Sequence, residues 1–301
     1  MTSLQLGPIV LGGNVFGWTV SQPEAFRLLD AYVDRGGRAI DTADVYGSWV
    51  PGNRGGESEE IIGAWLKARG NRDRVVLCTK VAKWSAQPGL SPANLRAAVD
   101  ASLARLATEY IDLYYAHQDD ESVPQSEYVA AFDALVRAGK VRVLGASNFK
   151  PERLASALAL SRANGLARFE VSQDHYNLVQ RGFETTLAPL LAREHLIELP
   201  YYALASGFLT GKYRPGAPAD SARAASAGKY LANPANVALL SVLDDLAAAH
   251  RVAIPAIALA WLRAQPLVGA PIASARTIDQ LGPLFDSATL TLSADELQRL
   301  G

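Results

Sequence analysis

The sequence has little that is typical of a secreted or membrane-spanning protein. Only one of its 301 residues is a cysteine, Cys78, so no disulfide can form within the chain and a reducing compartment is expected. No apolar run approaches the roughly 18 residues of a membrane span. The N-terminus has no basic segment followed by a long apolar stretch, so no signal peptide is expected. We therefore expect a cytoplasmic protein.

An excess of charge of one sign is also lacking. Lys and Arg together number 29 and Asp and Glu 30, which gives a net charge of −1. Proteins that bind nucleic acids or anionic membranes usually present a basic surface, so the composition predicts neither partner. The chain is 49% hydrophobic, which is enough to bury a large core. A small molecule is the expected partner, and the composition leaves the oligomeric state open.

Two nucleotide-binding fingerprints and a metal-binding pattern are missing as well. The stretch GGNVFG lacks the spacing of GxGxxG, and GxxxxGK[ST] does not occur. Of the four histidines, only His117 and His175 lie near predicted strand ends, which is too few for a metal-dependent barrel hydrolase. The sequence predicts no metal site. Cys78, within VVLCTKV, is expected to be a buried strand residue.

Short apolar runs alternate with amphipathic helices from end to end. The candidate strands are 8–13, 38–43, 75–81, 111–117, 141–147, 169–176, 197–204 and 268–274. Continuous apolar runs are typical of parallel strands that are covered on both faces. The pattern predicts a single-domain (β/α)8 TIM barrel over residues 1–301, with a long cofactor or substrate loop at about 210–236. A doubly wound open sheet is the alternative.

Several helix boundaries can be predicted from local patterns. Helical spacing predicts helices over 23–36 and 91–107, the second with Ser91 as its N-cap. Thr277 with Gln280, and Ser293 with Glu296, match the capping-box pattern and predict two more helix starts.

Polar residues follow the predicted strands at the edge where barrel enzymes place their catalytic groups. Asp41, Lys80 and His117 follow the second, third and fourth strands, and Tyr46 lies five residues past Asp41. A lysine cation lowers a tyrosine pKa from its usual value near 10, a carboxylate fixes the lysine, and a histidine orients a carbonyl or relays a proton. Such a group suits protonation of a carbonyl oxygen as a hydride reaches the carbon.

Each of these residues also has a purely structural interpretation. Asp41 could cap a helix, Lys80 could be a solvated charge and His117 could be a core histidine. Asp44, in the same segment as Asp41, is expected to be a loop or capping residue.

The chain resembles the aldo-keto reductases over nearly its whole length. The motifs that carry the resemblance are IDTADVYG, VVLCTKV, EYIDLYYAHQDD, GKVRVLGASNF, VSQDHYNL, SGFLTGKY and IASARTIDQL. The resemblance implies a single (β/α)8 barrel that uses NAD(P)H. It also implies that Tyr46 is the proton donor, that Asp41 and Lys80 tune it, and that His117 orients the substrate.

The same resemblance implies a set of cofactor-binding residues. Tyr201 matches the aromatic residue that stacks on nicotinamide, and Arg276 matches the position of a ribose 2′-phosphate, which favours NADPH (NADP+) over NADH. Pro283 and Leu284 replace a Glu-Asn pair that contacts adenine in the family, and Tyr202 is bulkier than the family residue. The full expected set is Gly13, Asn14, Val15, Asp41, Ser147, Asn148, Gln173, Tyr201, Leu204, Ser206, Gly207, Lys212, Ser274, Arg276 and Gln280.

Four aromatic residues are expected at the substrate site, namely Phe16, Trp18, Trp49 and Trp84. Such a lining suits flat or apolar carbonyl compounds, or the faces of sugars. The leading hypothesis is the reversible NADPH-dependent reduction of an aldehyde or ketone. The alternatives are a sugar or alcohol dehydrogenase running in the oxidative direction, a cofactor-binding regulatory subunit resembling potassium-channel β subunits, and a barrel isomerase or lyase.

Overall fold

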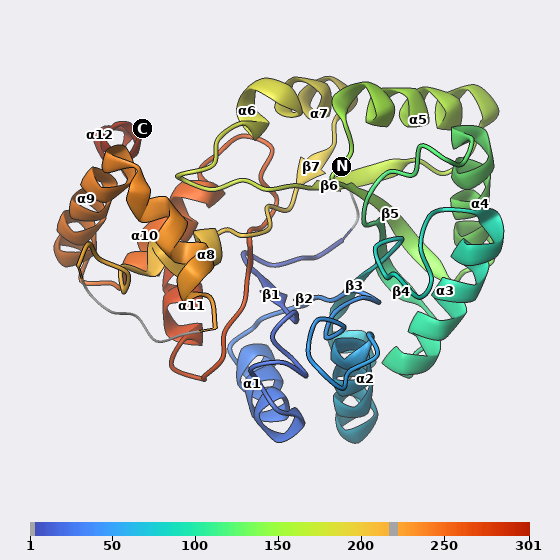
Figure 1. The fold of residues 1–301 in the computed structure, drawn as a ribbon, viewed down its shortest axis with the longest axis horizontal. Helices are drawn as coiled ribbons and strands as arrows, with labels where there is room; N and C mark the ends of the chain where they lie inside the picture. Colours follow the sequence, from blue (N-terminus) through green and yellow to red (C-terminus); the bar gives the residue numbers. More distant parts are fainter. Residues whose placement is uncertain (1–3, 217–221) are drawn as a thin grey trace.

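Eight parallel strands form one curled sheet at the centre of the molecule, with helices around it (Figure 1). The structure is a computed structural model that describes residues 4–216 and 222–301. The strands are β1 (Val10–Gly12), β2 (Ala39–Asp41), β3 (Val76–Val81), β4 (Ile111–Ala116), β5 (Val141–Ser147), β6 (Phe169–Gln173), β7 (Ile197–Glu198) and β8 (Ile272–Ala273). Their order is β7-β6-β5-β4-β3-β2-β1-β8, and every pairing is parallel.

Backbone hydrogen bonds also join the two ends of this sheet. The Glu198 amide donates to the Leu267 carbonyl at 2.8 Å, and the Gly269 amide donates back to the Glu198 carbonyl at 2.9 Å. The Ile272 amide donates to the Pro200 carbonyl at 2.9 Å. The predicted (β/α)8 barrel is therefore confirmed, and the open-sheet alternative is wrong.

Helices surround the barrel, most of them between successive strands. They are α1 (Gln22–Asp34), α2 (Glu57–Arg69), α3 (Pro92–Leu106), α4 (Gln125–Arg137), α5 (Pro151–Asn164), α6 (Phe183–Thr186), α7 (Ala188–Glu194), α8 (Ala224–Gly228), α9 (Pro234–His250), α10 (Ile254–Arg263), α11 (Leu281–Thr289) and α12 (Ala294–Leu300). Three short 3-10 helices add to these: η1 (Arg72–Arg74), η2 (Ala205–Thr210) and η3 (Lys229–Ala232).

The predicted loop at about 210–236 is only partly irregular. Residues 217–221 lie outside the described part of the chain, whereas α8, η3 and the start of α9 occupy much of the remainder. Among the described helices, none is both long and apolar enough to cross a membrane.

Alternate residues of the strands fill the interior of the barrel. Val10, Ala39, Cys78, Leu113 and Val143 belong to one buried cluster inside the ring. The intervening strand residues belong to a larger cluster that the strands share with the surrounding helices. Strands buried on both faces explain the continuous apolar runs in the sequence.

Two helix-start predictions have opposite outcomes. The Ser293 hydroxyl accepts from the Glu296 amide and the Glu296 carboxylate accepts from the Ser293 amide, so this capping box at α12 is confirmed. The box predicted at Thr277 is wrong, because α11 begins at Leu281. The Gln280 side chain instead accepts a hydrogen bond from the Arg276 amide at 2.9 Å and closes a turn before the helix.

Candidate active site

The strand register brings the predicted site residues to one end of the barrel interior. Successive side chains of a strand point to opposite faces, so the residue two positions after an interior residue is again interior. Asp41, Lys80 and Gln173 each lie two positions after a residue of the interior cluster, namely Ala39, Cys78 and Val171. Residues far apart in the sequence therefore form one polar layer above the apolar filling of the barrel.

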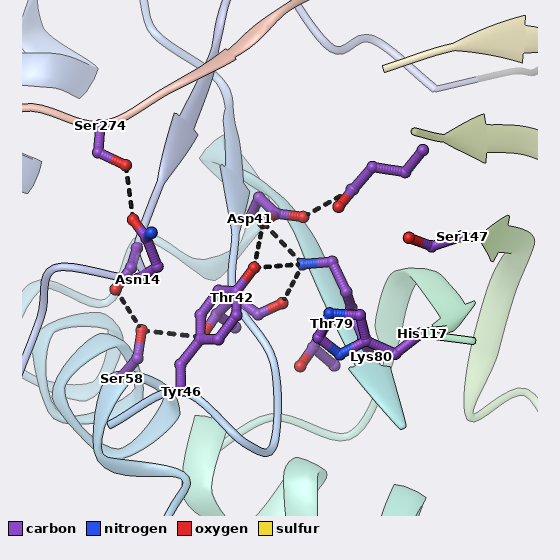
Figure 2. Close-up of polar contacts among 12 residues, drawn as sticks. Asn14, Asp41, Thr42, Tyr46, Ser58, Thr79, Lys80, His117, Ser147 and Ser274 are labelled. Carbon is purple, nitrogen blue, oxygen red and sulfur yellow. Dashed lines mark hydrogen bonds and ion pairs between the residues drawn. The ribbon is translucent and has the colours of Figure 1, made fainter. Parts of the chain in front are cut away.

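Lys80 lies at the centre of this layer with its side chain fully buried. Its Nζ donates to Asp41 Oδ2 at 2.7 Å, to the Thr42 carbonyl at 2.7 Å and to the Tyr46 hydroxyl at 3.1 Å (Figure 2). These three bonds use all three protons of the ammonium group. The Gln173 amide donates to the other carboxylate oxygen, Asp41 Oδ1, at 3.0 Å. The network fixes the Tyr46 hydroxyl beside a buried cation.

Burial changes the expected electrostatics of Tyr46. Desolvation raises its pKa to about 12, with Lys80 lowering it and Asp41 raising it. Lys80 thus lowers the Tyr46 pKa as expected from the sequence, but the cost of burying a phenolate exceeds the attraction of the cation. Lys80 behaves differently: burial lowers its pKa, but Asp41 and Tyr46 outweigh this effect and raise the pKa above its usual value. At neutral pH the pair is a phenol beside an ammonium ion.

His117 lies against the same tyrosine. The two ring centroids are 6.1 Å apart at 76°, and the imidazole is buried with no hydrogen-bond partner for Nδ1 among the described residues. Burial, with the nearby cations Lys80 and Lys83, lowers the His117 pKa well below its usual value. The ring is therefore neutral at pH 7, and its nitrogen can contact a polar group within the cavity.

A second network joins the residues that the sequence placed around nicotinamide. The Tyr201 hydroxyl donates to Asn148 Oδ1 at 2.8 Å, and Asn148 Nδ2 donates to the Ser147 hydroxyl at 2.9 Å and to the His117 carbonyl at 3.0 Å. The backbone amide of Asn148 donates to Asp174 Oδ1 at 3.1 Å. Asn148 has a φ of 57°, and these contacts hold it in that conformation.

The opposite face of Tyr201 packs on a residue that the sequence left unassigned. The His175 ring stacks on Tyr201 with a centroid distance of 5.5 Å and an interplanar angle of 22°. Neither a metal nor a catalytic role follows from this position. His175 instead supports the tyrosine ring from behind.

Left-handed backbone shapes the loop after β7. Ser206 has a φ of 56° and Gly207 a φ of 97°, and the chain turns there so that both line the cavity. Lys212 follows on the same wall, its Nζ 4.8 Å from the Tyr213 ring centroid. A cation on the cavity wall is a favourable neighbour for an anion.

The loops after β1 and β8 meet on the far side of the site. The Ser274 hydroxyl donates to Asn14 Oδ1 at 2.7 Å (Figure 2). The Gly13 amide donates to the Asp41 carbonyl at 2.7 Å, and a Cβ on Gly13 would lie 3.0 Å from that oxygen, so only glycine fits without a shift.

One cavity with a volume of 740 Å³ connects these groups. Of the predicted residues, those that line it are Asn14, Val15, Trp18, Asp41, Tyr46, Trp49, His117, Ser147, Asn148, Gln173, Tyr201, Leu204, Ser206, Gly207, Lys212, Ser274, Arg276 and Gln280. Lys80 and Gly13 are both buried and do not line it.

Two of the four aromatic residues expected at the substrate site do not line this cavity. Phe16 is fully buried in the outer core. Trp84 donates from its indole nitrogen to the Arg54 carbonyl at 2.9 Å and packs beneath Gly55 and Arg105. Both positions correspond to loop packing, which a single sequence cannot distinguish from substrate contact.

Trp18 and Trp49 do lie beside the reactive group. Their rings meet edge-on with centroids 5.8 Å apart, and Trp49 lies 6.0 Å from the Tyr46 ring. Several lining residues were not predicted from the sequence: Thr19, Lys83, Tyr202, Thr210, Ala222, Arg223 and Ser226. Most of them lie in loops outside the motifs that carry the family resemblance. The long loop at 210–236 was the available signal for the last four.

Asp44 lies in the turn after β2, as expected of a loop residue, but it is not exposed there. Its side chain is buried, neither carboxylate oxygen has a side-chain hydrogen-bond partner in the described residues, and burial, followed by the nearby Glu59, raises its pKa to about 8. No group of His, Cys, Asp and Glu in the described ranges could hold a metal ion.

Comparison with known proteins decides the family. The sequence profile of the Aldo/keto reductase family matches residues 8–301. The chain belongs to the aldo/keto reductase family.

Individual relatives are similar over nearly the whole of this chain. The uncharacterized oxidoreductase YrpG of Bacillus subtilis is 32% identical over 99% of this chain and 92% of its own. Protein tas of Escherichia coli is 31% identical over 99% of this chain and 94% of its own. Norsolorinic acid reductase stcV of Emericella nidulans is 32% identical over 100% of this chain and 79% of its own. The protein is an NAD(P)H-dependent aldo-keto reductase, and its family supports carbonyl reduction in general.

Proposed function

We propose that the protein is an NADPH-dependent reductase of aldehydes or ketones in which Tyr46 donates the proton. The observation that carries the proposal is the Lys80 ammonium group, which contacts both Asp41 and the Tyr46 hydroxyl below the cavity. NADPH supplies the hydride when it is bound. The residues of the chain position the carbonyl, provide the proton and stabilise the charge that remains.

Tyr46 has the protonation state that a donor requires. Its pKa of about 12 keeps the phenol protonated at neutral pH, so the proton is available. When the proton leaves, the phenolate forms 3.1 Å from the Lys80 ammonium, whose charge stabilises it. Asp41 keeps that cation in place through the 2.7 Å ion pair.

His117 is suited to orient the carbonyl oxygen. The neutral imidazole can donate one hydrogen bond without competing as a proton source, because its own pKa is well below the usual value. It packs against the Tyr46 ring, so an oxygen held by His117 is also close to the tyrosine hydroxyl. In the reverse direction the phenolate accepts the proton of an alcohol.

The cavity residues fit a phosphorylated dinucleotide. Lys212 and Arg276 are cations on its walls, and neither forms an ion pair within the described residues. We assign Lys212 to the pyrophosphate and Arg276 to the ribose 2′-phosphate, because a guanidinium group suits a phosphate. Ser147, Asn148 and Gln173 provide the polar contacts for the carboxamide, and Tyr201 provides the stacking surface.

The near-zero net charge and the 740 Å³ cavity support a small-molecule carbonyl or sugar as partner. A cytoplasmic location is part of the proposal and rests on the single, buried Cys78.

The proposal is tested with purified protein, NADPH or NADH, and a panel of aldehydes and ketones. Loss of nicotinamide absorbance with NADPH is expected for at least one carbonyl. Arg276→Gln should weaken NADPH binding, measured by protein fluorescence, and leave NADH binding within about twofold. Tight NADPH binding with no turnover across the panel would instead favour the regulatory-subunit alternative. No cofactor binding would contradict both.

A further inference from the structure

The cavity carries a marked excess of positive charge. The charged side chains that line it are Asp41, Lys83, Lys212, Arg223 and Arg276. Asp41 is already paired with the buried Lys80, so its charge is compensated. Four cations therefore face a cavity with no free carboxylate among its described lining residues.

The proposed function accounts for two of these cations. Lys212 and Arg276 are assigned to the cofactor phosphates, which leaves Lys83 and Arg223. Neither of the remaining two forms an ion pair within residues 4–216 and 222–301. A partly buried guanidinium group without an anionic partner is unfavourable, and a bound anion would remove that cost.

Arg223 is connected to the reactive centre through aromatic rings. Its Cζ lies 5.6 Å from the Trp18 ring centroid. Trp18 meets Trp49 edge-on at 5.8 Å, and Trp49 meets Tyr46 at 6.0 Å. The two indoles, which are perpendicular to each other, form a chain of ring contacts between the cation and the proton donor. A flat molecule that packs against one of these rings can present one end to Tyr46 and the other to Arg223.

The guanidinium group is suited to a carboxylate in this setting. Its planar fork makes two parallel hydrogen bonds to one carboxylate, and its face can remain on an indole while it does so. Burial lowers the Arg223 pKa from its usual value, with Arg276 also lowering it, so the environment around it favours an added negative charge.

We propose that Arg223 is a specificity-determining residue that binds an anionic group, such as a carboxylate, on an aromatic carbonyl substrate. This inference rests on the proposed reductase function. It identifies the substrate class as flat aryl aldehydes or ketones that carry a negative charge at the end remote from the carbonyl.

The competing role for Arg223 is a third contact to the cofactor phosphates. The two roles differ in what a charge-removing substitution changes. Loss of a substrate contact affects a charged substrate and spares a neutral one, because the cofactor is common to both. Loss of a phosphate contact affects both substrates equally and raises the dissociation constant of NADPH.

The test compares 4-carboxybenzaldehyde with its neutral methyl ester in the parent and in Arg223→Gln. We expect kcat/KM for the carboxylate to fall about 10- to 100-fold, as for a lost charged hydrogen bond, and the value for the ester to change less than about twofold. The NADPH dissociation constant should stay within about twofold. Lys229→Gln, which removes a cation of the same segment that does not line the cavity, should change neither substrate.

Binding of benzoate gives a readout that does not require turnover. Benzoate quenching of tryptophan fluorescence, from Trp18 and Trp49, should weaken by a similar factor in Arg223→Gln. Equal losses for both aldehydes, an increased NADPH dissociation constant, or unchanged benzoate binding would overturn the assignment. If the parent reduces neither aldehyde, the proposed function fails for this substrate class, and the benzoate measurement still decides whether Arg223 binds a carboxylate.

Discussion

Replacing Lys80 with methionine tests whether the buried ion pair organises the site. The substitution preserves most of the side-chain volume and removes three hydrogen bonds, at 2.7 Å to Asp41, 2.7 Å to the Thr42 carbonyl and 3.1 Å to Tyr46. The Asp41 carboxylate would then be a buried charge without its cation, because its side chain is only 3% exposed. Breaking such a pair from one side costs about 3–5 kcal/mol, so a loss of that size in the free energy of unfolding is expected.

A double substitution separates the pair from simple loss of packing. Asp41→Asn together with Lys80→Met removes both charges, and it should unfold at a higher urea concentration than Lys80→Met alone, with the same dependence on urea. The assay is urea unfolding followed by circular dichroism. A loss below about 1 kcal/mol in Lys80→Met, or no recovery in the double variant, would show that the ion pair is not the organising contact.

Three further predictions concern pH and packing. Because the Tyr46 pKa is about 12, carbonyl reduction should lose no activity through deprotonation of Tyr46 below roughly pH 10. Alcohol oxidation should increase with pH. A loss of reduction near pH 8 that is absent from Tyr46→Phe would contradict this prediction. Burial raises the Asp174 pKa from 3.8 to about 6, so the folded state favours the protonated acid and this stabilisation is lost as pH rises. Relative to Asp174→Asn, the parent should lose about 2 kcal/mol of unfolding free energy between pH 4 and 6, and parallel pH profiles would refute the shift. A Cβ on Gly63 would collide with the Arg105 carbonyl, so Gly63→Ala should lower the free energy of unfolding by about 1–3 kcal/mol, measured by thermal or urea unfolding. Gly282→Ala is the control: its Cβ meets nothing within 4 Å, so it should be neutral or stabilising.

The barrel and its polar layer could be predicted because they follow from periodicity. Asp41, Lys80 and Gln173 each lie at the end of an apolar strand, and parallel strands bring such ends together whatever their separation along the chain. The local rules that worked, such as the Ser293 capping box, depend on a few neighbouring residues.

Apart from the local capping box at Thr277, the failures depend on contacts between distant segments. Trp84 was expected at the substrate and instead donates a hydrogen bond to the loop carbonyl of Arg54. Arg223 lines the cavity from the loop before α8, which no spacing rule describes. The Tyr46 pKa is raised because burial outweighs the lysine beside it, and the extent of burial is a property of the packed structure.

The most direct test of the account is the rate of hydride transfer in Tyr46→Phe. A single-turnover measurement with NADPH and a reducible aromatic aldehyde avoids control by product release. The account predicts a rate about 10²- to 10⁴-fold below that of the parent, with the NADPH dissociation constant unchanged within about twofold. A variant that reduces the aldehyde at the parent rate would show that Tyr46 is not the proton donor.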